Sequence, residues 1–126
     1  MAIERIDLNK PEWNFTFSNC VVAGDFVFTS HVGGYDAEAS RWPETIEGQT
    51  RQCFATLSRY LAAAGATLDD VVRINVLLKR TEDFQGMREV YRHQFANGYP
   101  VRTAWFTEFL DEECLIQIDA VAYKPG

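Results

Sequence analysis

The sequence predicts an α+β fold in which a mixed β-sheet carries two helices on one face. Two stretches have apolar residues at helical spacing, and both lie between stretches with the period-two alternation of strands. The predicted order is strand, strand, helix, strand, helix, strand, strand, and helices packed on one face of the sheet bury both apolar stripes. No repeat or linker divides the 126 residues, so we expect one domain over residues 1–126.

The first two predicted strands form a β-hairpin. Residues 17–23 and 26–30 are strand-like, and Gly24-Asp25 between them is a two-residue turn signal. Residues 31–44 contain turn-forming residues and predict a loop.

A long amphipathic helix is predicted between Thr45 and Gly65. Glycine is common just past a helix end, and this length corresponds to about five turns. The apolar stripe consists of Ile46, Cys53, Phe54, Leu57, Tyr60, Leu61 and Ala64.

The second half of the chain predicts three strands and a helix. Residues 71–79 form a long strand whose apolar face holds Val72, Ile74, Val76 and Leu78. A helix follows over residues 83–96, and Pro100 prevents its continuation. The last two strands are expected over residues 101–107 and 114–123.

Composition limits the partners of the chain. Eighteen Asp and Glu against 12 Lys and Arg give a net charge of −6, whereas nucleic-acid binding draws its affinity from clustered cations. We therefore expect no nucleic-acid partner. No apolar run approaches the roughly 18 residues of a transmembrane helix, and the N-terminus lacks a signal-peptide pattern, so we expect a cytoplasmic protein with no membrane partner.

The length of the chain bears on where a ligand binds. At this size folding buries about two-thirds of the surface of the unfolded chain, which makes a core but not a deep cleft walled by one chain. A second subunit is therefore expected to complete any substantial pocket.

Two charged residues interrupt the apolar pattern of their own strands. Arg102 shares a strand face with Ala104 and Phe106 just after a proline, which makes it a candidate anion clamp. Asp119 lies in the middle of the last strand, where an unpaired carboxylate is costly to bury. Its partner is either Arg73 or Arg102, and an ordinary structural ion pair is an equally weighted interpretation.

Other polar residues carry weaker signals. His31 follows the second strand, and a structural or solvent-facing role is favoured over acid-base chemistry. Cys53 is expected in the core with the helix stripe. The three cysteines form no CxxC or Cys/His group, which predicts reduced, buried thiols without a disulfide framework or a metal site: Cys20, Cys53 and Cys114.

Six short motifs occur in order along almost the whole chain. They are Thr50-Arg51-Gln52, the run Ala63-Ala64-Gly65-Ala66-Thr67-Leu68-Asp69-Asp70-Val71-Val72, Asp83-Phe84, Val90-Tyr91, Tyr99-Pro100-Val101-Arg102-Thr103 and Ile116-Gln117-Ile118-Asp119-Ala120-Val121-Ala122. Together they resemble the Rid family, also called YjgF or reactive intermediate deaminase. The resemblance implies a chorismate-mutase-like fold, assembled as a homotrimer with sites between neighbouring subunits. It also implies hydrolysis of reactive 2-imino acids, formed from enamines such as 2-aminoacrylate, to 2-keto acids and ammonia, without a cofactor or a metal.

The resemblance also assigns roles to individual residues. Arg102 is similar to the arginine that grips the substrate carboxylate, and Asp119 stands where a glutamate near the attacking water is usual. Ser30 matches a strand serine of the family. Three further residues of the implied substrate site depart from the family pattern, namely Phe17 for a tyrosine, His31 for a glycine and Arg88 for an asparagine.

These departures suggest a divergent subgroup and leave other functions open. The alternative is a module that binds small carboxylate metabolites at the trimer interface without turnover. An endoribonuclease, as some relatives are named, is less favoured because the chain is acidic and lacks a basic stripe.

Overall fold

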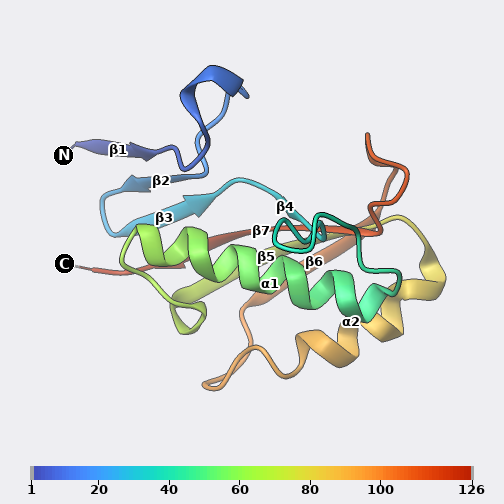
Figure 1. Cartoon of the computed structure of the whole chain (residues 1–126). Helices are drawn as coiled ribbons and strands as arrows, with labels where there is room; N and C mark the ends of the chain where they lie inside the picture. The colour runs from blue at the N-terminus through green and yellow to red at the C-terminus, as the bar shows by residue number, and fades with distance from the viewer. Residues whose placement is uncertain (1, 126) are drawn as a thin grey trace.

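Within residues 2–125, which the computed structural model describes, seven strands form one mixed sheet (Figure 1). The strands are β1 (Ile3–Ile6), β2 (Cys20–Ala23), β3 (Phe26–Thr29), β4 (Val32–Gly33), β5 (Val71–Leu78), β6 (Val101–Phe106) and β7 (Ile116–Tyr123). The helices are α1 (Ile46–Ala63) and α2 (Phe84–Tyr91), with short 3₁₀ turns at Pro11–Trp13, Leu68–Asp70 and Thr81–Asp83. No helix in this part of the chain is long and apolar enough to cross a membrane.

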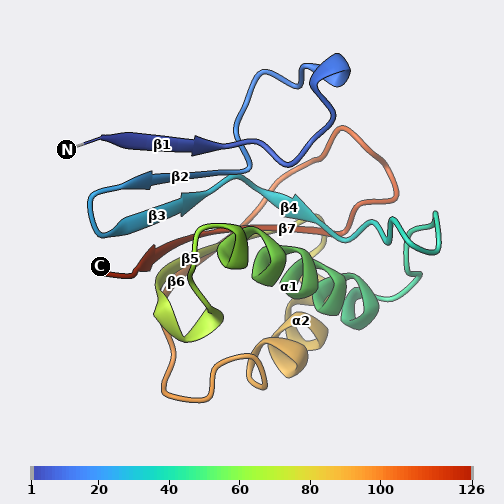
Figure 2. The ribbon, with the colours of Figure 1, turned by 60° about the vertical axis from the view of Figure 1, so that its left-hand side comes forward.

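The strand order in the sheet is β1-β2-β3-β7-β5-β6, and β4 pairs with β7. Strand β5 runs parallel to β6 and antiparallel to β7. Both helices cover the same face of the sheet (Figure 2), as the sequence predicts. The mixed α+β architecture is therefore confirmed.

Helix α1 begins and ends at the predicted residues. The Thr45 hydroxyl accepts a hydrogen bond from the Gly48 backbone N–H at 3.0 Å, which caps the first turn. Gly65 follows the helix with a φ of +80°, a conformation that glycine adopts without steric cost. The buried residues of the helix include most of the predicted stripe and add two polar positions, Gln49 and Thr50, whereas Tyr60 and Ala64 of the stripe are half-buried.

Helix α2 is shorter than the predicted span over residues 83–96. It ends at Tyr91, and the following residues turn back toward the core. Phe95 is nevertheless buried, with its ring centroid 5.2 Å from that of Tyr91 and 5.8 Å from that of Phe54. Aromatic packing therefore buries Phe95 outside the helix. In the sequence, its place in the apolar pattern predicts that the helix continues to this residue.

Three other sequence expectations differ from the structure. The hairpin strands are shorter than predicted, and strands β1 and β4 lie in segments where the sequence predicts no strand. A register shift between Val71 and Arg73 marks a β-bulge in β5, and it leaves Val72 43% exposed instead of on the buried face.

The two faces of the sheet differ in what covers them. The face beneath the helices is buried and consists of alternate residues of β5 and β7: Ile74, Val76, Leu78, Ile116, Ile118, Ala120 and Ala122. The opposite face, which we call the open face, carries alternate residues that remain exposed and apolar: Ile3, Phe26, Phe28, Val101, Trp105 and Tyr123. Exposed apolar area of this extent on one face is typical of an interaction surface.

The buried Gln49 side chain ties α1 to the start of β7. Its amide N–H groups donate to the carbonyl oxygens of Pro43 and Glu113, at 3.0 and 2.8 Å. Its carbonyl oxygen accepts from the Leu115 backbone N–H at 2.8 Å. One side chain thus satisfies three backbone groups that no helix or strand ladder pairs.

Replacing Gln49 is therefore expected to be costly. Gln49→Ala leaves those backbone groups without a partner, and we expect the free energy of unfolding to fall by about 3 kcal/mol in urea denaturation at a fixed protein concentration. The control is Gln52→Ala on the same helix, which removes only a 3.5 Å contact to Thr56, with an expected loss below about 0.5 kcal/mol. Equal losses in the two variants would contradict the bridging role of Gln49.

Candidate functional site

The two charged residues that interrupt the strand pattern lie on opposite faces of the sheet. Arg102 pairs in register with Ile74, which is fully buried beneath the helices. Asp119 pairs with Asn75, the next residue along β5. Directly paired residues point to the same face and consecutive residues to opposite faces. One chain therefore does not bring Arg102 and Asp119 together.

The Arg102 guanidinium lies over two aromatic rings of α2. Its Cζ atom is 4.9 Å from the centroid of the Tyr91 ring and 5.5 Å from that of Phe84. These contacts use the flat face of the guanidinium and leave its N–H groups for a planar anion such as a carboxylate. Arg102 forms no ion pair with any of residues 2–125.

A cavity of about 530 Å³ opens beside this guanidinium. Its walls are formed by Arg88, Glu89, Tyr91, Arg92, Tyr99, Pro100 and Arg102. Arg92 Nη1 lies 3.3 Å from Glu89 Oε1, so this arginine already has a carboxylate partner. Arg88 has none among the described residues, and the cavity, which we call the arginine cavity, therefore presents two uncompensated guanidiniums.

Tyr91 forms a wall of the arginine cavity. The residue is 4% exposed, and its hydroxyl has no hydrogen-bond partner within the described chain. Burial raises the pKa of the Tyr91 phenol, although the positive charge of Arg102 acts in the opposite direction. The ring thus stays neutral near pH 7 and keeps its proton.

On the open face, the partner of Asp119 is an amide. The side-chain N–H of Asn75 donates to Asp119 Oδ1 at 2.9 Å. Sequence analysis leaves the partner between Arg73 and Arg102, but neither forms an ion pair with Asp119 in the described structure. Strand register explains the difference, because it sets Asn75 directly opposite Asp119 while Arg102 points to the other face. Asn75 is a residue that sequence reasoning missed, and its alternation with Arg73 on β5 is the signal that marks this polar strip.

The chain between β3 and β4 sets Ser30 and His31 beside Asp119. Phe28 pairs with Val121, and Val32 pairs with Ile118. Three residues, 29–31, therefore lie opposite the two residues 119 and 120 of β7, as in a β-bulge. The Ser30 hydroxyl donates to the carbonyl oxygen of His31 at 3.2 Å.

A row of aromatic rings leads to His31. Trp13, Phe15, Phe17 and His31 follow one another with ring centroids 5.5, 6.1 and 5.6 Å apart. The last three line a second cavity of about 800 Å³ that also reaches Trp42 and the outer side of α1. The predicted site residues thus form two groups, one with Arg88 and Arg102 and one with Phe17, Ser30, His31 and Asp119.

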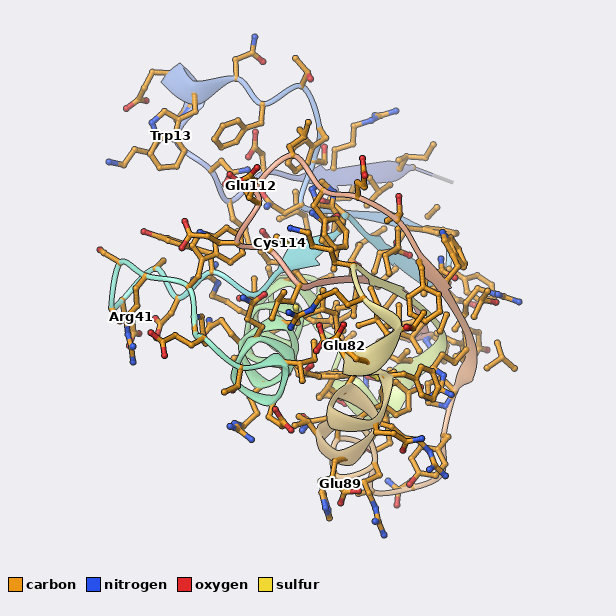
Figure 3. All side chains as sticks on the ribbon, turned by 90° about the vertical axis from the view of Figure 1, so that its right-hand side faces the viewer. Trp13, Arg41, Glu82, Glu89, Glu112 and Cys114 are labelled. Atoms are coloured by element: carbon orange, nitrogen blue, oxygen red, sulfur yellow. The ribbon has the colours of Figure 1, made fainter. Side chains whose placement is uncertain are left out.

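Figure 3 shows that the aromatic row begins far from the lining of the arginine cavity. Trp13, which begins the aromatic row, and Glu89, which lines the arginine cavity, are labelled at opposite ends of the molecule. In residues 2–125 no group of three or more His, Cys, Asp or Glu residues is placed to hold a metal ion.

Comparison with known proteins gives the family. The sequence model described as Endoribonuclease L-PSP matches residues 8–124. A RutC family protein of Pyrococcus horikoshii is 35% identical over 117 residues, which cover 92% of this chain and 93% of the relative. The chain belongs to the YjgF/RidA family.

Two further similarities support this membership. A protein of Capra hircus named 2-iminobutanoate/2-iminopropanoate deaminase is 27% identical over 109 residues, covering 86% of this chain and 80% of the relative. A crystal structure from Rhodopseudomonas palustris, titled a probable translation initiation inhibitor, is 27% identical with a TM-score of 0.86, covering 99% of this chain and 100% of that one.

In this YjgF/RidA protein all three cysteines are free and buried. Burial raises the pKa of each thiol, most of all that of Cys53, which lies between α1 and the sheet. None of the three lines either cavity described above, which agrees with the core position predicted for Cys53.

The thiols should therefore be inert in the folded protein. We expect a thiol reagent at pH 8 to label the native protein far more slowly than the urea-denatured protein, in which all three residues react. Mass spectrometry of the labelled peptides identifies the site. Rapid labelling of one cysteine in the native state would show that it is not packed as described.

Proposed function

We propose that this protein hydrolyses 2-imino acids to 2-keto acids and ammonia, in clefts formed between the subunits of a homotrimer and without a cofactor. The observation that carries the proposal is the Arg102 guanidinium, which two rings hold in place and no carboxylate of residues 2–125 neutralises. The named activity of the Capra hircus relative supports the reaction class.

The open face supports assembly from copies of this chain. Exposed apolar side chains gather there, including Phe28 and Trp105. A neighbouring subunit that covers this face with its edge strand β6 would bring its own Arg102 toward Asp119. Closed cyclic symmetry would then repeat the same site at every interface.

In the proposed reaction Arg102 binds the substrate carboxylate. Two parallel N–H···O bonds from the planar guanidinium orient the adjacent C=N carbon, which a single ammonium group cannot do as well. The aromatic contacts of Arg102 reduce the motion of the guanidinium, so less orientational entropy is lost on binding.

Asp119 of the neighbouring subunit orients the attacking water. The carboxylate accepts a proton from the water as the water oxygen bonds to the imine carbon, and it passes that proton to the imine nitrogen, which gives a neutral tetrahedral carbinolamine. Asp119 then transfers the proton of the carbinolamine hydroxyl to the amino group; the carbon–nitrogen bond breaks, ammonia leaves, and the oxygen becomes the keto group. The Asn75 hydrogen bond holds one carboxylate oxygen, which leaves the other for the water. Because aspartate is one methylene shorter than glutamate, the water lies closer to β7 than it would beside a glutamate.

The clamp is tested by substitution. Arg102→Ala is expected to abolish acceleration of 2-iminobutanoate hydrolysis without loss of the fold, because the exposed side chain contributes little to the core. Keto-acid formation is followed while an amine trap competes for the imine, and circular dichroism checks the fold. The control is Arg51→Ala, which alters an exposed arginine of α1 that lines neither cavity and should keep its turnover. Turnover near that of the unchanged protein in Arg102→Ala would refute the clamp.

A second candidate function is binding without turnover. The replacements at Phe17, His31 and Arg88 favour it, because loss of a phenol removes a hydrogen-bond donor and the other two add bulk at the site. Saturable binding of 2-oxobutanoate with no acceleration of imine hydrolysis would identify such a module.

The description of the family as endoribonuclease L-PSP supplies a third candidate. The net charge of −6 opposes it, because phosphate binding depends on clustered cations. RNA cleavage that persists in Arg102→Ala would point to a different site or to contamination.

A further inference from the structure

We propose that the arginine cavity selects ligands with two carboxylates, with Arg102 binding one and Arg88 the other. Under the function proposed above, on which this inference rests, the preferred substrate is a 2-imino dicarboxylic acid. The second carboxylate would lie on the substrate side chain, so Arg88 is a specificity-determining residue.

The fold places Arg88 and Arg102 beside the same tyrosine, Tyr91. Arg88 and Tyr91 are three residues apart on α2, and residues at this spacing are neighbours on a helix surface. The Arg102 guanidinium lies over the ring of that same tyrosine, 4.9 Å from its centroid. Arg88 and Arg102 are therefore both neighbours of Tyr91, and both line one cavity.

The charges in the arginine cavity are not balanced by the protein. The lining includes three arginines and one glutamate, and that glutamate is paired with Arg92. Two like charges near each other in a partly enclosed cavity repel until an anion enters. A monocarboxylate compensates one of them, whereas a dicarboxylate compensates both. The lining of this cavity is thus positively charged, although the whole chain carries a net charge of −6.

The simpler interpretation of Arg88 is structural. It lies in the last turn of α2, where a cation interacts favourably with the helix dipole. That role predicts no effect of Arg88 on ligand preference, so the same variant separates the two interpretations.

The test compares 2-iminoglutarate with 2-iminopentanoate, two five-carbon imino acids that differ in the terminal carboxylate. Each is generated in situ from its amino acid, and kcat/KM is measured on the assembled protein. We expect the ratio to favour 2-iminoglutarate by about tenfold or more and to fall by about tenfold in Arg88→Asn. The matched control is Arg51→Asn, which alters an exposed arginine of α1 that lines neither cavity and should keep the ratio. A ratio of one or less in the unchanged protein, or a ratio that Arg88→Asn does not move, would overturn the proposal.

Calorimetric binding of 2-oxoglutarate and 2-oxopentanoate distinguishes a failure of the dicarboxylate site from a failure of the proposed deaminase function. Tighter binding of 2-oxoglutarate that Arg88→Asn abolishes, in a protein that hydrolyses neither imine, would refute the proposed function and support the dicarboxylate site. Hydrolysis of both imines at equal rates, with equal binding of the two keto acids, would refute the dicarboxylate site and leave the proposed function standing.

Discussion

The pleat of strand β5 determines how a site can form in this protein. Ile74 and Asn75 are consecutive, so their side chains point to opposite faces of the sheet. Ile74 is paired with Arg102 and Asn75 with Asp119, the two charged residues of the candidate site. Arg102 beside Ile74 therefore lies on the face that the helices cover, exposed beside α2, and Asp119 beside Asn75 lies on the open face. No side-chain rotation can bring a guanidinium and a carboxylate together through a hydrogen-bonded sheet. A cleft that uses both requires two copies of the chain.

The rest of the architecture holds each half of the site in position. Helix α2 places two rings against Arg102, and α2 is itself held by packing against α1 and by the buried aromatic cluster around Phe54. The Gln49 bridge joins α1 to the start of β7, the strand that carries Asp119. Core packing and site geometry are thus coupled through the same few elements.

Sequence patterns predict the parts of this structure that depend on local periodicity. The span of α1 between Thr45 and Gly65 and the alternation around Arg102 depend on local features, and both are confirmed. The early end of α2 depends on aromatic packing, and the exposed Val72 depends on a bulge between paired strands; neither leaves a periodic signal. The partner of Asp119 depends on register between β5 and β7, which is long-range information. The separation of the two site groups cannot be predicted from the sequence either. Which residues of different strands share a face depends on the strand order and register of the sheet.

The most direct test of this account mixes subunits of two inactive variants. Under the proposed function, Arg102→Ala and Asp119→Ala are each expected to lack deaminase activity when assembled alone. When the two chains are denatured, mixed in equal amounts and refolded, random assembly should leave about one quarter of the sites with both residues intact. Activity should return to about that fraction of the unchanged protein treated in the same way, while each variant refolded alone stays inactive. A mixture as inactive as its two components would contradict a site shared between subunits.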